Sequence, residues 1–403
     1  MEKGQGLRKQ MNAIGIIILI AIVSATPPIA TDLCLPAIPD MPAYFNTSEA
    51  VVNLMLVGFF FFMAVGMLLL GPLSDKYGRK KVLVASLLVF AGCSALCSFA
   101  VNIWMLVALR VIQGLGGGGM VSIGTALVKD CFEGDMRAKV LVAAMAIGVV
   151  APMFAPVLGA FILTFTTWQG TFVAQAVVAL CALPLALRLV EPLAPEDRVT
   201  ESLGRTLGRL VVVGRNKNFI FLLLCCALCS APYMAYISSA SYIYTGFFGL
   251  SKLEYSAFFA ANAVVSAVGA WLVIAVQKRV APRVSLPVSF GLSLLSGIGL
   301  LLVGHLSPFS FLAVYAVFTL CGGFIRPCVT AVLLEQQEGD TGSASSLINT
   351  TNTVLGSVGM LCATLPWSTY INGLGICITV AVAVAFAGLL VILLSGRFNI
   401  KGL

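Results

Sequence analysis

The sequence predicts an all-α polytopic membrane protein with 12 transmembrane helices in two six-helix bundles. Of its 403 residues, 60% are hydrophobic and only 10% are charged, whereas a soluble domain carries about 25% charged residues. Its mean hydropathy is +1.03. Apolar runs of roughly 20 residues recur along the chain, long enough for helices to cross a bilayer and too long for the strands of an outer-membrane barrel.

Charged or turn residues bound each apolar run and so set the predicted spans. The first six spans lie at 12–38, 51–73, 82–101, 103–128, 138–164 and 169–188. The second six lie at 219–245, 253–277, 285–304, 309–334, 343–367 and 371–395. Residues 189–218 form the one long charged connection. We therefore expect an N-terminal bundle at 1–188, a cytoplasmic linker at 189–218 and a C-terminal bundle at 219–403.

The basic residues indicate the topology, because short cytoplasmic loops are enriched in Lys and Arg. With both termini in the cytoplasm, all but three of the 24 Lys and Arg residues fall on the inner side. The exceptions are Lys252, in an outer loop, and Arg110 and Arg326, inside spans. Topology thus accounts for the net charge of +8, and we expect no nucleic-acid partner.

One carboxylate, Asp32, lies in the far third of the first apolar run. A charge inside a bilayer costs at least ~2.5 kcal/mol on insertion scales, so such residues usually face a cavity or a partner and have a function. The alternative is that Pro27 and Pro28 end the helix and leave Asp32 in water as an interfacial or capping residue.

Arg110 and Gln113 place a guanidinium and an amide in span 4, before a glycine-rich stretch at 114–119 that permits close helix approach. Counted from the predicted outer ends of their spans, at ~1.5 Å per residue, Arg110 and Asp32 both lie about 10 Å deep. Two opposite charges at one depth in one bundle predict an ion pair. The glycine stretch lacks the Gly-Lys-Ser/Thr ending of a phosphate loop, which argues against ATP as an energy source.

The loop between spans 2 and 3 reads Gly-Pro-Leu-Ser-Asp-Lys-Tyr-Gly-Arg-Lys-Lys from residue 71 to 81. With this pattern the chain resembles the major facilitator superfamily of secondary transporters. The resemblance implies the major facilitator fold and a cytoplasmic latch, for which the residues here are Gly71, Asp75, Gly78, Arg79 and Asp130. We expect Arg79 to pair with Asp130, and Asp75 to meet the N-terminal end of span 11 near residue 342.

Span 5 contains Gly148, Pro152, Pro156 and Gly159, small and helix-bending residues that indicate a close crossing. Such a fifth span is typical of antiporters in the superfamily. Stretches 31–39, 241–251, 254–262 and 342–347 resemble its Bcr/CflA branch of drug:proton antiporters. That resemblance implies that Asp32 is the proton-binding carboxylate and that Arg110 modulates it.

Aromatic, amide and soft side chains supply the lining that a promiscuous binding cavity needs. The residues chosen for the cavity are Gln113, Met145, Tyr233, Tyr236 and Arg326. Arg326 departs from the small or amide residues expected beside the glycines of span 10. Either it extends toward the membrane surface and its phospholipids, or it favours an anionic or carbonyl-rich substrate.

These features favour proton-coupled efflux of amphiphilic drugs or other small molecules by alternating access, driven by the proton gradient without a cofactor or metal. An exporter or importer of a metabolite, such as a sugar or amino acid, is the nearest alternative. A non-transporting receptor or an intramembrane enzyme is more distant, since no catalytic constellation is found within the spans. We expect a monomer in the bacterial inner membrane, with a small-molecule substrate, protons and the lipid bilayer as its partners.

Overall fold

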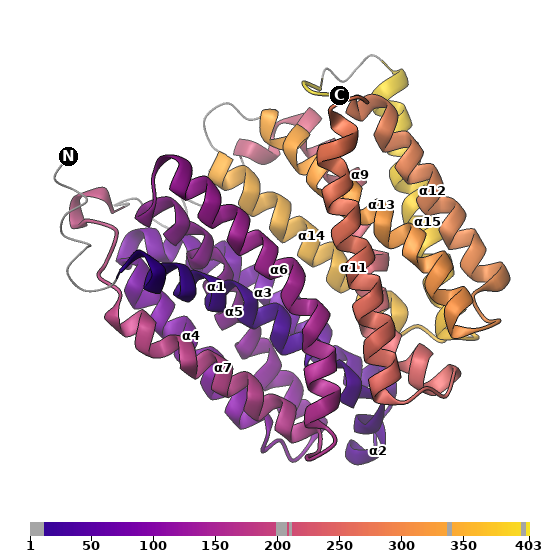
Figure 1. Ribbon diagram of the computed structural model, residues 1–403, viewed down its shortest axis with the longest axis horizontal. Coiled ribbons are helices and arrows are strands. Elements are labelled where there is room, and N and C mark those ends of the chain that lie inside the picture. Colours follow the sequence, from indigo (N-terminus) through magenta and orange to yellow (C-terminus); the bar gives the residue numbers. More distant parts are fainter. Residues whose placement is uncertain (1–11, 199–207, 209–211, 337–340, 396–399) are drawn as a thin grey trace. The chain divides into compact units, whose positions relative to one another are not determined.

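The computed structural model contains helices and no strands in the part it describes. That part comprises residues 12–198, 208, 212–336, 341–395 and 400–403, and it includes side chains except at 135, 138, 141–152, 197, 341 and 342. The chain divides into two compact units, Met1–Leu207 and Gly208–Leu403, each built of long helices that run side by side (Figure 1). The predicted linker at 189–218 stays a prediction, because 199–207 and 209–211 lie within it and outside the described residues.

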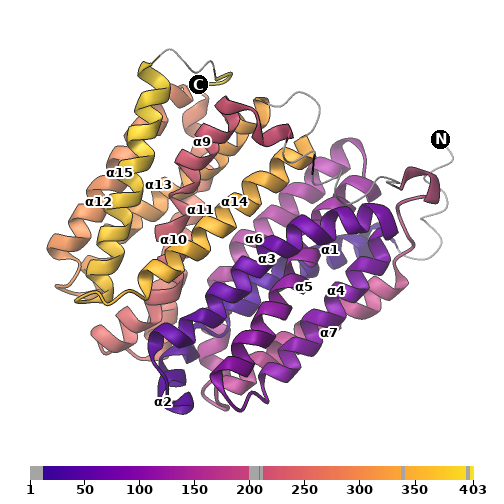
Figure 2. The same cartoon turned by 180° about the vertical axis from the view of Figure 1, so that it is seen from behind.

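Unit 1 is built around α5, which packs against α3 and α4, while α1 contacts α5, α6 and α7 (Figure 2). A Cβ atom added to Gly114 would collide with the carbonyl oxygen of Phe59, so the glycine stretch of α5 lets the backbone of α3 approach closely. The elements of this unit are α1 Ala13–Asp32, η2 Leu35–Asp40, α2 Met41–Phe45, α3 Glu49–Tyr77, α4 Arg79–Cys97, α5 Ile103–Cys131, α6 Gly134–Ile162, α7 Trp168–Arg188 and η3 Pro195–Asp197.

Unit 2 pairs α12 with α13 and α15, α11 with α13, and α10 with α14. The single span predicted at 219–245 is broken, because Pro232 has no N–H to donate to the carbonyl of Leu228. It forms two α-helices followed by a π-helix. The elements of this unit are α9 Lys217–Ala227, α10 Ser230–Ser241, η4 Tyr242–Phe247, α11 Lys252–Gln277, α12 Pro282–Val303, α13 Pro308–Glu335, α14 Thr341–Ala363 and α15 Tyr370–Leu394.

Ten helical segments within the described ranges are long and apolar enough to cross a membrane. The helices α6 and α14, which correspond to predicted spans 5 and 11, are not among those ten, so the number twelve stays a prediction. Large apolar side chains remain exposed on several spans, for example Trp271 at 66%, Leu295 at 64% and Val380 at 57%. Such exposure is expected where helices face lipid.

The first span changes its type of helix near its outer end. Helix α1 stops at Asp32 and a 3-10 helix follows from Leu35, and both lie within one candidate membrane span, Ala13–Phe45, which includes the predicted end at residue 38. Pro27 and Pro28 lie inside α1 and do not end it. Asp32 is only 6% exposed, so the alternative of a solvated capping residue is wrong.

Candidate functional site: a buried carboxyl and a buried guanidinium in unit 1

The Asp32 carboxyl group lies where the backbone of the first span changes from α-helix to 3-10 helix. In the described part of the chain, no hydrogen bond or ion pair reaches this carboxyl group. Its neighbour Thr31 is fully buried, and the carbonyl of Thr31 accepts a hydrogen bond from the Cys34 thiol at 3.1 Å. A carboxylate buried without a partner is costly, so this site favours either protonation or the arrival of a cation.

Gly159, the last residue of the Gly and Pro set predicted in span 5, lies against the same turn. Helix α6 packs on α1 and η2, and a Cβ atom added to Gly159 would collide with the carbonyl oxygen of Leu33. Gly159 therefore lets the two backbones touch directly beside Asp32. Pro156 is buried in the same helix. Gly148 and Pro152 are helical, but their side-chain environments lie outside the described part.

Arg110 is fully buried in the middle of unit 1. Its Nη1 donates to the Oε1 of Gln113 at 2.8 Å, and its guanidinium lies over the ring of Phe59 at 4.2 Å and near that of Phe172 at 5.7 Å. Such cation–π contacts stabilise a desolvated cation. Nε and Nη2 have no hydrogen-bond partner among the described atoms.

Gln113 is held by two further polar side chains from neighbouring helices. Its Nε2 donates to the Oγ of Ser94 on α4 at 2.6 Å and to the Oε1 of Gln175 on α7 at 3.2 Å. Gln113 is fully buried and accepts the hydrogen bond of Arg110, and its predicted place in the substrate cavity stays a prediction. Sequence reasoning missed Ser94, Gln175 and Phe172, although polar residues inside apolar spans were a usable signal.

The predicted ion pair between Asp32 and Arg110 is absent from the described structure. Helix α1, which ends at Asp32, packs against α5, which contains Arg110, so the two groups lie on neighbouring helices of unit 1. The depth along each helix was the basis of the prediction, and depth does not determine the direction in which a side chain points. The guanidinium is instead occupied by Gln113 and by the face of Phe59.

The latch loop forms a second polar cluster, centred on Arg79. Its Nε donates to the Oδ2 of Asp130 at 2.8 Å, its Nη1 to the Oγ of Ser74 at 2.6 Å, and its Nη2 pairs with Asp75. The predicted Arg79–Asp130 ion pair is therefore present. Ser74 in turn donates to the carbonyl of Gly71 at 2.6 Å. The contact predicted between Asp75 and the start of span 11 would join the two units and stays a prediction.

Glu191, just after α7, joins the same cluster and was missed from the sequence. Its carboxylate accepts hydrogen bonds from the backbone N–H groups of Arg79 and Lys80 at 2.7 and 3.1 Å. Glu191 and Arg79 are 112 residues apart, so no local pattern connected them.

Three of the residues predicted to line the substrate cavity lie in unit 2, and their role stays a prediction: Tyr233, Tyr236 and Arg326. Tyr236 is 1% exposed and stacks on Tyr315 with ring centroids 4.1 Å apart, which makes it part of an aromatic core. Tyr233 is half-buried and Arg326 is exposed on α13. Met145, the fifth predicted cavity residue, lies in α6 of unit 1, and its side chain is outside the described part. No three potential metal ligands converge within the ranges that were described.

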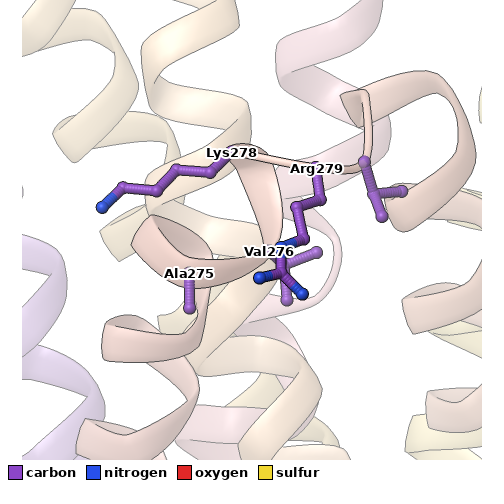
Figure 3. Close-up of a pocket in the computed structure, with 5 residues that line it drawn as sticks. Ala275, Val276, Lys278 and Arg279 are labelled. Carbon is purple, nitrogen blue, oxygen red and sulfur yellow. The ribbon is translucent and has the colours of Figure 1, made fainter.

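An open hollow of about 550 Å³ lies at the end of α11 and contains none of the predicted site residues. Lys278 and Arg279 line it together with Ala275, Val276 and Val280. Figure 3 shows the two basic side chains extending in different directions from the end of the helix. It therefore offers no converging set of charges for a single ligand.

Comparisons with known proteins fit this architecture. Residues 16–360 match the family described as Major Facilitator Superfamily. A bicyclomycin resistance protein homolog of Haemophilus influenzae is 25% identical, over 93% of this chain and 96% of the relative. The multidrug resistance protein MdtL of Salmonella heidelberg is 27% identical over 74% of both chains. A solved D-xylose-proton symporter shares the fold, with a TM-score of 0.71, 14% identity, and coverage of 92% of this chain and 97% of that one.

Proposed function

The chain belongs to the Major Facilitator Superfamily, and from that premise we propose that it exports amphiphilic small molecules in exchange for protons that bind Asp32. As a member of that family it is a multi-pass membrane transporter and not an enzyme. The proposal adds the direction of transport, the coupling ion and the class of substrate.

The observation that carries the proposal is the buried carboxyl group at the end of α1. Asp32 is 6% exposed and has no partner among the described residues. The charged carboxylate is therefore much less stable in this environment than the neutral carboxyl group. A proton that binds there favours conformations in which the group is buried, and proton loss favours conformations in which it meets water or a cation. Coupling requires such differential binding to two states.

Arg110 supplies the cation in this mechanism. Gln113 and the ring of Phe59 hold its guanidinium in place, while Nε and Nη2 remain without partners in the described part. These two N–H groups are suited to bind a carboxylate when a rearrangement of the bundle brings Asp32 to them. Gly159 permits the close approach of α6 to this turn, so a shift of α6 changes the setting of Asp32 directly.

The proposed class of substrate is inferred from the names of two relatives and from the side chains on α10. One relative is named a bicyclomycin resistance protein homolog and another a multidrug resistance protein, and we transfer drug export to this chain on that basis. Half-buried Tyr233 and Met234 on α10 offer the aromatic and polarizable surface that amphiphilic compounds favour.

A proton-coupled transporter of a metabolite is the second candidate. The exposed base Arg326 on α13 favours it, because a guanidinium binds anionic or carbonyl-rich compounds well. In both cases we place the protein as a monomer in the bacterial inner membrane with both termini in the cytoplasm, since that orientation follows the distribution of Lys and Arg.

Transport by purified protein in liposomes with an imposed pH gradient tests the proposal. The parent protein should drive uptake of a fluorescent amphiphilic cation into liposomes with an acidic lumen, and Asp32→Asn should abolish the gradient-driven part. Asp40→Asn is the matched control, because Asp40 is an exposed carboxylate in the following 3-10 helix. Gradient-driven uptake by Asp32→Asn at the parent rate would show that the proton site is elsewhere.

A further inference from the structure

The start of helix α4 is held by a carboxylate from a distant part of the chain. The residue before the helix is Gly78, which has no side chain to accept hydrogen bonds from the first turn. Glu191 supplies this acceptor: Oε1 accepts from the N–H of Arg79 at 2.7 Å and Oε2 from that of Lys80 at 3.1 Å. A carboxylate is well suited to this place, because backbone N–H groups and the helix dipole make the N-terminus electropositive.

The backbone of the loop is shaped around this carboxylate. Gly78 has a φ of 103°, which residues with a side chain rarely adopt. A Cβ atom at position 78 would also lie 2.5 Å from the Oε2 of Glu191. The glycine therefore gives both the turn and the space for the carboxylate. Oε1 additionally accepts a long hydrogen bond from the N–H of Leu193 at 3.4 Å, which fixes the local chain around Glu191.

Glu191 and the latch residues bind different parts of Arg79. The main chain of Arg79 is fixed by Glu191, while its side chain is fixed by Ser74, Asp75 and Asp130. Arg79 is only 8% exposed, so its guanidinium cannot adjust freely if its backbone moves. The position of the guanidinium relative to Asp130 thus depends on whether Glu191 is docked.

We infer that Glu191 is a positioning residue of the cytoplasmic latch. It docks the first residues of the linker onto the start of α4, and it thereby keeps the guanidinium of Arg79 within hydrogen-bond distance of Asp130. The latch then forms only while this end of the linker is docked, and the linker is a coupling element and not merely a tether. The consequence for transport rests on the proposed function, whereas the contact itself does not.

Amide hydrogen exchange of the purified full-length protein tests the docking directly. The first N–H groups of a helix are unprotected unless a cap binds them, so Glu191→Ala should speed exchange at Arg79 and Lys80 about tenfold. Glu191→Gln keeps one acceptor oxygen and should have a smaller effect. Glu196→Ala, which removes an exposed carboxylate in the same linker, should change nothing. Unchanged exchange at Arg79 and Lys80 in folded Glu191→Ala would overturn the inference.

A double-mutant cycle with Arg79→Ala separates positioning from general stability. If Glu191 acts through Arg79, then Glu191→Ala should lower turnover by about tenfold in the parent protein and by less than about twofold in Arg79→Ala. Glu191→Gln should restore part of the turnover. Multiplicative losses in the double variant would overturn the positioning role. Should the parent show no proton-driven transport, the proposed function fails, while amide exchange still decides whether Glu191 holds α4.

Discussion

Replacing Arg110 by Lys keeps the charge in unit 1 but removes the geometry that places it. Arginine donates to Gln113 at 2.8 Å while its plane covers Phe59 at 4.2 Å, and a compact ammonium on a flexible stem cannot do both. A hydrogen bond from a charged group contributes about 1.5–3 kcal/mol and a desolvated cation–π contact about 2 kcal/mol. If Lys retains half of this, about 2 kcal/mol is lost, which is roughly a 30-fold decrease in kcat/KM.

The assay is substrate-dependent proton flux in liposomes, measured at low substrate concentration for Arg110→Lys and Arg110→Gln. We expect Arg110→Lys to be strongly impaired and Arg110→Gln to be inactive. Arg137→Lys, at a half-buried Arg near the start of α6, is the matched control and should transport normally. If Arg110→Lys transports at the parent rate, charge alone is sufficient and the contacts with Gln113 and Phe59 have no role in transport.

Three further substitutions test other parts of the account. Gly159→Val forces its side chain against the carbonyl of Leu33 and should lower efflux from cells at least tenfold. Gly92→Ala places its methyl group in open space and should have no effect. Efflux by Gly159→Val at the parent rate would show that the close contact is not required. Arg79→Ala leaves two carboxylates unpaired and should destabilise unit 1 by about 1–3 kcal/mol, seen as a lower unfolding temperature in detergent; an unchanged temperature would contradict this. Arg326→Ala should selectively impair transport of anionic compounds. If the variant transports every tested substrate at the parent rate, Arg326 has no role in substrate binding and contacts phospholipid instead.

Much of the fold could be predicted because membrane spans are set by local composition. The family and the helical architecture follow from apolar runs and from the loop at 71–81, and the comparisons confirm both. Breaks within spans were missed. Proline alone does not predict such a break. Pro27 and Pro28 lie inside the continuous helix α1, whereas Pro232 lies just after the break between α9 and α10. Neighbouring helices decide which break is tolerated.

The site was predicted only where a motif linked residues to one another. Arg79 was paired with Asp130 through the latch pattern, and that ion pair is present. Arg110 was paired with Asp32 from depth alone, and that pair is absent from the described residues because helix rotation and side-chain direction are not readable from depth. Glu191 lies far from Arg79 in sequence, and a single carboxylate in a charged linker carries no pattern of its own.

Asp32 is proposed to bind the proton that the transporter exchanges for its substrate. Proton release when a substrate binds to the detergent-solubilised protein, recorded with a pH indicator in weak buffer, tests it most directly. The parent protein should release protons on binding, whereas Asp32→Asn should bind the same substrate and release none. Equal proton release by Asp32→Asn would contradict the account.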